Sequence, residues 1–216
     1  MIQVYFMPGM AANPSIFKDI KLPEEKFSSH YLEWFVPKKG MSISEYAKEM
    51  CGKITHKNVV LIGVSFGGII IQEMAKHIQV KKLIVISSVT ASKQLPKRML
   101  FAKYTKAHKL LPTGLVNNIE LLVKYAFGEI VIKRLDMYEQ YLSVRDKYYI
   151  DWAIDQIVNW EQEECVFNHV HIHGDKDAVF PIENINNCVK VRKGTHIMII
   201  NRFKWFNEYL PAIILE

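Results

Sequence analysis

A buried apolar run ends in a serine set between glycines at residues 59–70, which read VVLIGVSFGGII. The first four residues are typical of a strand covered on both faces, and the apolar residues after Gly68 begin a helical pattern. A turn that joins a buried strand directly to a helix leaves little room for side chains, so Gly63 and Gly67 are sterically required. The stretch predicts a tight strand–turn–helix unit that presents Ser65 at the carboxyl edge of a sheet.

Short β-rich apolar runs alternate with longer helical patterns along the chain. Candidate strands cover residues 2–7, 29–35, 59–62, 83–87, 166–173 and 188–191. Candidate helices cover residues 42–54, 68–77 and 198–210, and the first begins with Ser42 and Glu45 at capping-box spacing. Strands that alternate with helices pair in parallel through right-handed crossovers. The pattern therefore predicts an α/β fold with a doubly wound parallel sheet.

One region, residues 92–164, interrupts this alternation. It contains no convincing strand but is rich in Leu, Tyr, Lys and Ile at helical spacing, and Pro96, Pro112, Gly114 and Gly128 divide it. Because it lies between strands of one sheet, we interpret it as a helical insertion in a single domain that spans residues 1–216. Such an insertion either adds packing or caps the carboxyl edge, where open α/β sheets bind ligands.

Composition and local patterns exclude several classes of protein. The net charge is +6, but the lysines are scattered and form no basic–aromatic repeat, so no nucleic-acid partner is expected. Cys51, Cys165 and Cys188 are widely spaced, which argues against a disulfide framework or a metal site and fits a reducing compartment. GVSFGG lacks phosphate-loop spacing, so no cofactor is expected. The first residues read as a strand and no run reaches membrane-spanning length, so we expect a cytoplasmic protein with no membrane partner.

Ser65 needs a general base to become a nucleophile, and eight histidines are available. His196 lies in a loop after the last candidate strand, on the same sheet edge as Ser65, whereas the others lie in strand patterns or in helical or connecting stretches. A carboxylate must orient the imidazole. The loop after residues 83–87 has none, but the loop after residues 166–173 has Asp175 and Asp177, and the residues alone do not separate the two.

Two backbone N–H groups are candidates for an oxyanion hole. One is the N–H of Phe66, directly after the serine, and the other is the N–H of Met10 in the loop after the first strand. A plain βα turn is an equally good interpretation of that first loop, because backbone donors leave almost no side-chain pattern.

The chain closely resembles the α/β-hydrolase superfamily over nearly its full length. The resemblance is carried by FMPGMAANPSIF, GVSFGG, HIHGDKDAVFP and KGTHIMI, and it extends to a compact, poorly characterised bacterial subgroup with similar segments. It implies a six-stranded parallel sheet in the order 2-1-3-4-5-6, a helical cap, and Asp177 as the acid, since the family pattern H-G-x-x-D-x-x-x-P places it there. Pro8 stands where the family usually has histidine before Gly9, so the first loop departs from the family pattern.

Together these features predict an α/β-hydrolase of the carboxylesterase type. Ser65, His196 and Asp177 would form its catalytic triad, and the Met10 and Phe66 N–H groups its oxyanion hole. The expected substrate is a small molecule, a carboxylic ester or thioester of a largely apolar acyl compound. The apolar preference rests on insertion residues that could equally be core, namely Leu100, Phe101, Tyr104, Leu110, Leu111, Tyr125 and Phe127. The alternative is a ligand-binding protein of the same fold with little or no turnover.

Overall fold

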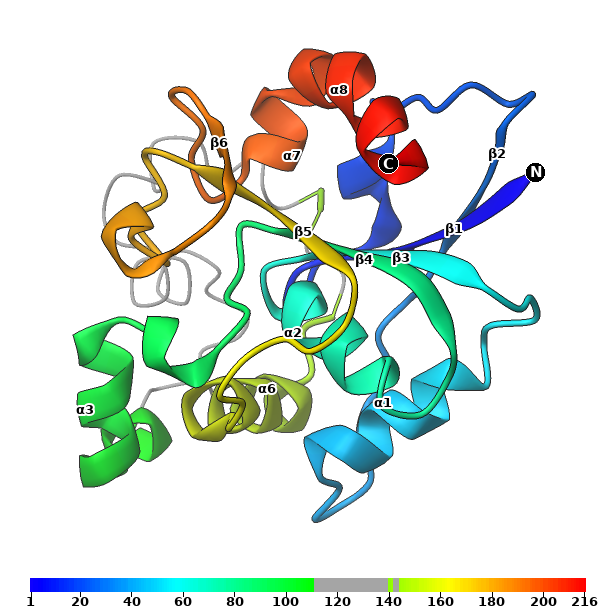
Figure 1. Cartoon of the computed structure of the whole chain (residues 1–216). Helices are drawn as coiled ribbons and strands as arrows, with labels where there is room; N and C mark the ends of the chain where they lie inside the picture. Colours follow the sequence, from blue (N-terminus) through cyan, green and yellow to red (C-terminus); the bar gives the residue numbers. More distant parts are fainter. Residues whose placement is uncertain (111–139, 142–143) are drawn as a thin grey trace.

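The structure, a computed structural model, describes residues 1–110, 140–141 and 144–216. In these residues one parallel six-stranded sheet forms the centre of the molecule (Figure 1), with the order β2-β1-β3-β4-β5-β6. The strands are β1 (Ile2–Met7), β2 (Phe27–Tyr31), β3 (Val59–Val64), β4 (Val80–Ile86), β5 (His169–Gly174) and β6 (Val189–Val191). The predicted α/β class and strand order are both confirmed: the chain has the α/β-hydrolase fold.

The strand ends differ from the sequence prediction where pairing overrides local composition. β2 begins at Phe27, two residues before the predicted start, because Phe27 is opposite Ile2, and the register runs to Tyr31 opposite Phe6. The chain then leaves the sheet, so the predicted strand end at residue 35 is wrong. β5 begins at His169 instead of residue 166, since its register with β4 starts there.

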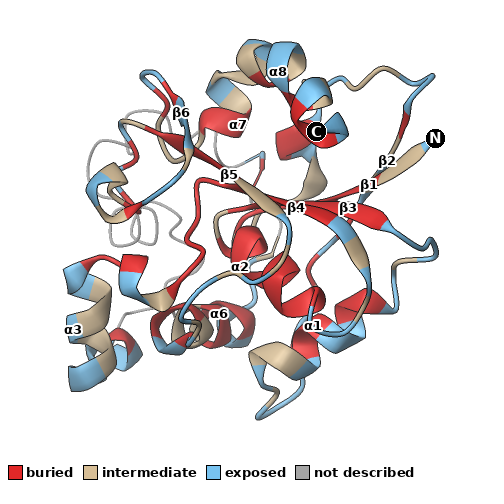
Figure 2. Ribbon diagram, in the orientation of Figure 1, coloured by how far each residue is buried: buried red, intermediate tan, exposed pale blue. Residues whose placement is uncertain are grey.

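Helices cover both faces of the sheet (Figure 1). On one face lie α1 (Ile43–Cys51), α2 (Phe66–Met74) and α6 (Lys147–Asn159), and on the other lie α7 (Met198–Asn201), α8 (Phe203–Leu215) and the 3₁₀ helix η1 (Pro14–Phe17). Alternate residues of β1 contribute to the two cores: Tyr5 and Met7 to one, Val4 and Phe6 to the other. Figure 2 shows the central strands and α2 as largely buried. The site described below lies at the carboxyl edge of this buried sheet.

Helix ends follow their local chemistry. Ser42 caps α1 as predicted: the Glu45 N–H donates to Ser42 Oγ over 3.3 Å, and the Ser42 N–H donates to Glu45 Oε2 over 2.8 Å. The helix predicted over residues 198–210 is two helices, because the backbone at Arg202 (φ −123°, ψ 23°) is not helical.

The described part of the insertion is helical, as predicted. It comprises η2 (Ser92–Gln94), α3 (Lys97–Thr105), η3 (Ala107–Leu110) and then α6. Phe101, Tyr104 and Leu110 are exposed, so they belong to neither core, whereas Leu100 packs partly against the core on the α2 face. Leu111, Tyr125 and Phe127 lie outside the described residues.

Candidate active site

Ser65 occupies the turn between β3 and α2, and its backbone is strained. Its φ of 54° and ψ of −122° lie outside the regions that residues with a Cβ normally adopt. The Ser65 N–H donates to Ile86 O of β4 over 2.9 Å, and Ser88 Oγ donates to Ser65 O over 2.7 Å. The neighbouring strand therefore holds the serine in this conformation, with its side chain at the start of α2, where the helix dipole favours negative charge.

Close backbone approach explains the glycines on either side of the turn. A Cβ on Gly63 would lie 2.3 Å from Gly67 O, and a Cβ on Gly67 would lie 2.4 Å from Pro8 O. Neither contact can be relieved by moving a flexible side chain, because both partners are backbone atoms. The sequence inference that these two glycines are sterically required agrees with the geometry.

His196 comes to Ser65 from the loop after β6. Its Nε2 lies 2.9 Å from Ser65 Oγ. The loop is held against the end of β5: a Cβ on Gly174 would lie 2.3 Å from Gly194 O, and the Lys176 N–H donates to Gly194 O over 2.8 Å. The loop after β5 and the loop after β6 are thus packed together two residues before His196.

Asp177, and not Asp175, contacts the other nitrogen of His196. Its Oδ2 and Oδ1 lie 2.9 and 3.1 Å from His196 Nδ1. Oδ1 also accepts the N–H groups of Val179 (2.8 Å) and Phe180 (3.0 Å). Burial by itself would raise the pKa of Asp177, but His196 and these N–H groups outweigh it, so the pKa lies below its usual value.

An ionised Asp177 sets the tautomer of His196. A carboxylate can only accept, so His196 Nδ1 carries the proton and Nε2 is left as an acceptor for the Ser65 hydroxyl. This is the arrangement in which an imidazole can take a proton from a serine.

Two buried histidines of β5, His171 and His173, lie next to the loop that carries Asp177. His173 Nε2 donates to Phe180 O over 2.8 Å and lies 3.6 Å from Asp177 Oδ2. His173 Nδ1 lies 3.2 Å from His171 Nε2, and burial lowers the pKa of His171 to about 3. Both imidazoles are therefore neutral at pH 7. In the sequence these two histidines lie in a strand pattern. Their closeness along the chain to Gly174 and Asp177 is the one signal that could have indicated a role near the site.

The loop after β1, which contains Met10, lies next to Ser65. A Cβ on Gly9 would lie 3.5 Å from Ser65 Cβ, which is ordinary contact. Two aromatic residues that sequence reasoning missed hold this loop: Trp34 Nε1 donates to Gly9 O over 2.8 Å, and the Ala11 N–H donates to Tyr149 Oη over 3.2 Å. Neither residue belongs to a motif, so no sequence signal could have singled them out.

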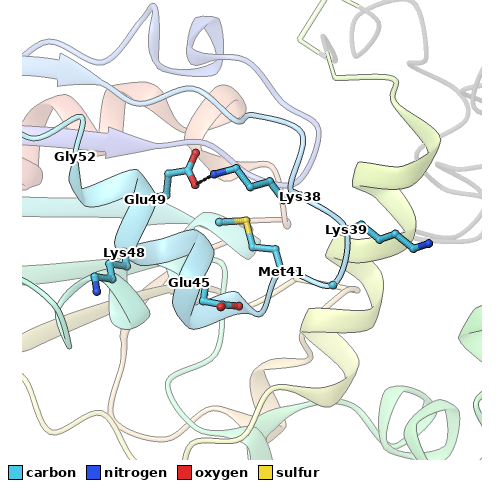
Figure 3. Close-up of a pocket in the computed structure, with 8 residues that line it drawn as sticks. Lys38, Lys39, Met41, Glu45, Lys48, Glu49 and Gly52 are labelled. Atoms are coloured by element: carbon cyan, nitrogen blue, oxygen red, sulfur yellow. Dashed lines mark hydrogen bonds and ion pairs between the residues drawn. The ribbon is translucent and has the colours of Figure 1, made fainter.

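A separate open groove of about 600 Å³ lies along α1 (Figure 3), lined by Lys38, Lys39, Gly40, Met41, Glu45, Lys48, Glu49 and Gly52. An ion pair of 3.0 Å joins Lys38 to Glu49 across it. None of the three residues Ser65, Asp177 and His196 lines this groove, so it is not the site described above.

Two further features are absent from the ranges that the structure describes. No group of three or more His, Cys, Asp or Glu side chains there is arranged to hold a metal ion. No helix within those ranges is long and apolar enough to cross a membrane.

Comparison with solved structures shows the same fold in several enzymes. A thermophilic esterase from Thermogutta terrifontis superposes with a TM-score of 0.74 at 13% identity, covering 99% of this chain and 89% of the esterase. A bromoperoxidase from Bacillus anthracis has a TM-score of 0.71 at 16% identity and coverages of 100% and 92%. Est816, an N-acyl homoserine lactone degrading enzyme, has a TM-score of 0.70 at 16% identity and coverages of 98% and 93%.

No protein-family model and no curated protein sequence matches the chain. At identities this low the structural matches establish the α/β-hydrolase fold and leave the reaction open.

Proposed function

We propose that the protein is a serine hydrolase that cleaves carboxylic esters or thioesters of small, largely apolar acyl compounds. The observation that carries the proposal is the continuous hydrogen-bonded chain from Ser65 Oγ through His196 to Asp177, with distances of 2.9 Å on both sides of the imidazole. A buried, ionised carboxylate, an oriented imidazole and a strained serine are the parts that acyl transfer needs. The esterases among the structural neighbours support the same reaction class.

The reaction would proceed in two halves. Ser65 Oγ attacks the carbonyl carbon while His196 Nε2 takes the hydroxyl proton, and Asp177 stabilises the imidazolium that forms. The N–H groups of Phe66 and Met10 would bind the negative oxygen of the tetrahedral intermediate. His196 then gives its proton to the leaving alcohol or thiol. In the second half, water activated by His196 hydrolyses the acyl-enzyme and restores Ser65.

The preference for an apolar acyl group rests on the insertion of residues 92–164, which we propose to act as a cap over the carboxyl edge of the sheet. In its described part, Met99, Leu100 and Val144 pack against the core cluster that also contains Phe66 and Tyr149. The insertion therefore adds apolar side chains to the core on the α2 face, and we propose that such side chains also face the acyl group, since they suit an acyl chain better than a charged group.

A panel of short-chain esters, thioesters and lactones tests this proposal. The wild type is expected to turn over at least one class repeatedly, and Ser65→Ala to lower kcat by about 10⁴–10⁶-fold. Asp177→Asn is expected to lower kcat by about 10³–10⁴-fold because it no longer fixes the tautomer of His196. Asp175→Asn is the matched control, since both carboxylate oxygens bonded to His196 Nδ1 belong to Asp177, and it should leave kcat within about threefold.

Retained turnover in Ser65→Ala would contradict the serine mechanism. Tight ligand binding without product from any substrate would favour the ligand-binding alternative. A fluorophosphonate probe that labels Ser65 complements the panel, because it reports a reactive serine even when the natural substrate is missing from the panel.

A further inference from the structure

The first loop contains a strained residue beside the proposed Met10 donor. Ala11 has a φ of 62°, in the left-handed region that residues with a Cβ avoid. Its N–H donates to the hydroxyl of Tyr149, a residue of α6 that is fully buried. Burial raises the pKa of Tyr149 well above its ordinary value, so the hydroxyl stays neutral and keeps accepting this N–H.

Residues that precede α6 bond to the first loop at two further points. The Val144 N–H donates to Ala11 O over 3.2 Å, so both backbone groups of Ala11 are bonded to residues 144–149. The Asn13 N–H donates to Tyr141 O over 2.8 Å. A residue in the left-handed region persists only where its surroundings hold it, and Val144 and Tyr149 of the insertion hold Ala11.

Trp34 connects this loop to the start of α2. Its indole N–H bonds to Gly9 O, and its ring stacks on Phe66 with centroids 5.1 Å apart and planes 6° from parallel. The Trp34 ring also contacts Tyr149, with centroids 5.6 Å apart. The two segments that carry the proposed oxyanion donors, Met10 and Phe66, are therefore held by one buried aromatic group.

We propose that Tyr149 is a positioning residue of the hydrolysis reaction, whose hydroxyl holds the Ala11 backbone so that the Met10 N–H faces the oxyanion formed at Ser65. The inference rests on the proposed function. Tyr149 touches no reacting atom in this account, and it acts only through the loop. Because a donor must be placed within a few tenths of an ångström of the developing charge, loss of the Tyr149 hydroxyl should slow chemistry more than it weakens binding.

The preceding residue, Tyr148, offers a matched control. Its hydroxyl accepts the N–H of Gly40 over 3.1 Å and donates to Lys38 O over 3.2 Å. Gly40 also has a left-handed backbone, with a φ of 77°, but its loop borders the groove of Figure 3, which contains none of the proposed catalytic residues. Adjacent tyrosines of one helix thus make the same kind of bond to two different loops.

The experiment compares Tyr149→Phe with Tyr148→Phe and the wild type. For the best substrate of the panel we expect Tyr149→Phe to lower kcat by about 10- to 100-fold with KM changed less than about threefold. The rate at which a fluorophosphonate labels Ser65 should fall by a similar factor, and amide exchange in a peptide spanning residues 7–13 should accelerate. Tyr148→Phe should change kcat and labelling by less than about twofold.

A Tyr149→Phe variant with kcat and labelling within twofold of Tyr148→Phe overturns the inference. If Tyr149→Phe does not fold, the Ala11 amide of the wild type decides by NMR: exchange as fast as an unprotected amide overturns the inference, and strong protection supports it. The Ser65→Ala variant separates the two proposals. Loss of turnover there together with a fully active Tyr149→Phe leaves the hydrolase standing and removes only the role of Tyr149.

Discussion

Two turns at the carboxyl edge of the sheet hold unusual backbone conformations by different means. At the turn after β3, Ser65 is held by close packing of backbone against backbone, which only glycine at positions 63 and 67 allows, and by its hydrogen bonds with Ile86 and Ser88. In the loop after β1, the Ala11 N–H donates to Tyr149 Oη and the Ala11 carbonyl accepts the Val144 N–H, and both partners lie more than 130 positions away along the chain.

The difference has a physical consequence for how each turn responds to change. Backbone packing tolerates no added atom, so the β3 turn is rigid as long as the sheet is intact. A loop held by a few hydrogen bonds can lose one of them and remain folded, at a net cost of about 1 kcal/mol for each bond. We therefore expect substitutions at the β3 turn to affect folding and substitutions around the β1 loop to affect mainly reactivity.

The largest expected effect is on stability and separates the two kinds of turn. Gly67→Ala places a Cβ 2.4 Å from Pro8 O and 2.5 Å from Met7 O, so it should lower the free energy of unfolding by about 3 kcal/mol or more, or prevent folding. Gly9→Ala, whose Cβ meets only an ordinary contact at 3.5 Å, should change it by less than about 1 kcal/mol. Urea denaturation measures both. Equal losses in the two variants would show that the turns are not held differently.

A second prediction concerns the loop that carries Asp177, which is held by neutral buried histidines. His171 has a pKa of about 3 in the folded protein and about 6.5 when unfolded, so the unfolded chain binds the extra proton between these values. Stability should therefore fall as pH drops from 6.5 towards 3, with His171 contributing about 1–2 kcal/mol of the loss between pH 7 and 5. His173, whose pKa is also lowered, adds a loss of the same sign in this range. Asp177, whose lowered pKa starts from an ordinary carboxyl value of about 4, adds a loss of the same sign only at lower pH.

The variant His171→Gln should flatten this pH dependence, and denaturation midpoints at pH 7, 6 and 5 measure it. His77→Gln is the control, because the His77 side chain is exposed and bonds to Ser44 Oγ at the surface. A slope that is the same in the wild type and in His171→Gln would mean that folding does not lower the pKa of His171.

The smallest effect tests the hydrogen-bonded component of the β3 turn. Ser88→Ala removes the bond to Ser65 O and should cost about 1 kcal/mol of unfolding free energy. The adjacent Ser87 has a buried hydroxyl with no hydrogen-bond partner in the described residues, so Ser87→Ala should be neutral or slightly stabilising. Thermal denaturation resolves the two. A larger loss in Ser87→Ala than in Ser88→Ala would contradict the assignment of these bonds.

The same contrast explains what could be predicted from the sequence. Steric constraint selects glycine, and so Gly63 and Gly67 pointed directly to Ser65 and the turn. Strand and helix alternation predicted a doubly wound parallel sheet, and the family resemblance implied its strand order. The loop after β5 supplied Asp175 and Asp177 as the carboxylates. The family pattern H-G-x-x-D-x-x-x-P favoured Asp177, whereas the residues alone left both open, because the direction of a side chain within a loop depends on contacts such as those of Asp177 with Phe180 and His196.

Hydrogen bonds between distant side chains leave no such pattern. Tyr149 and Trp34 were unremarkable aromatic residues in the sequence, since any core uses such residues at helical or strand spacing. Their partners are backbone atoms of the first loop, whose identity does not depend on residue type. The predicted end of β2 at residue 35 is wrong for a related reason. β2 ends at Tyr31, where its pairing with β1 ends, and this pairing depends on a distant segment of the chain.

The bond between Ala11 and Tyr149 spans 138 positions of the chain, and the bond between Ser65 and His196 spans 131. Contacts this distant close only after the intervening segments have collapsed, because the entropy of closing long loops must be overcome first. The serine turn, whose partners in β4 follow it within about 25 residues, can form early. A chain in which the Ser65 turn has formed but His196 has not yet reached it would carry an unreactive serine. Reactivity of Ser65 towards an acylating probe would therefore report the last step of folding.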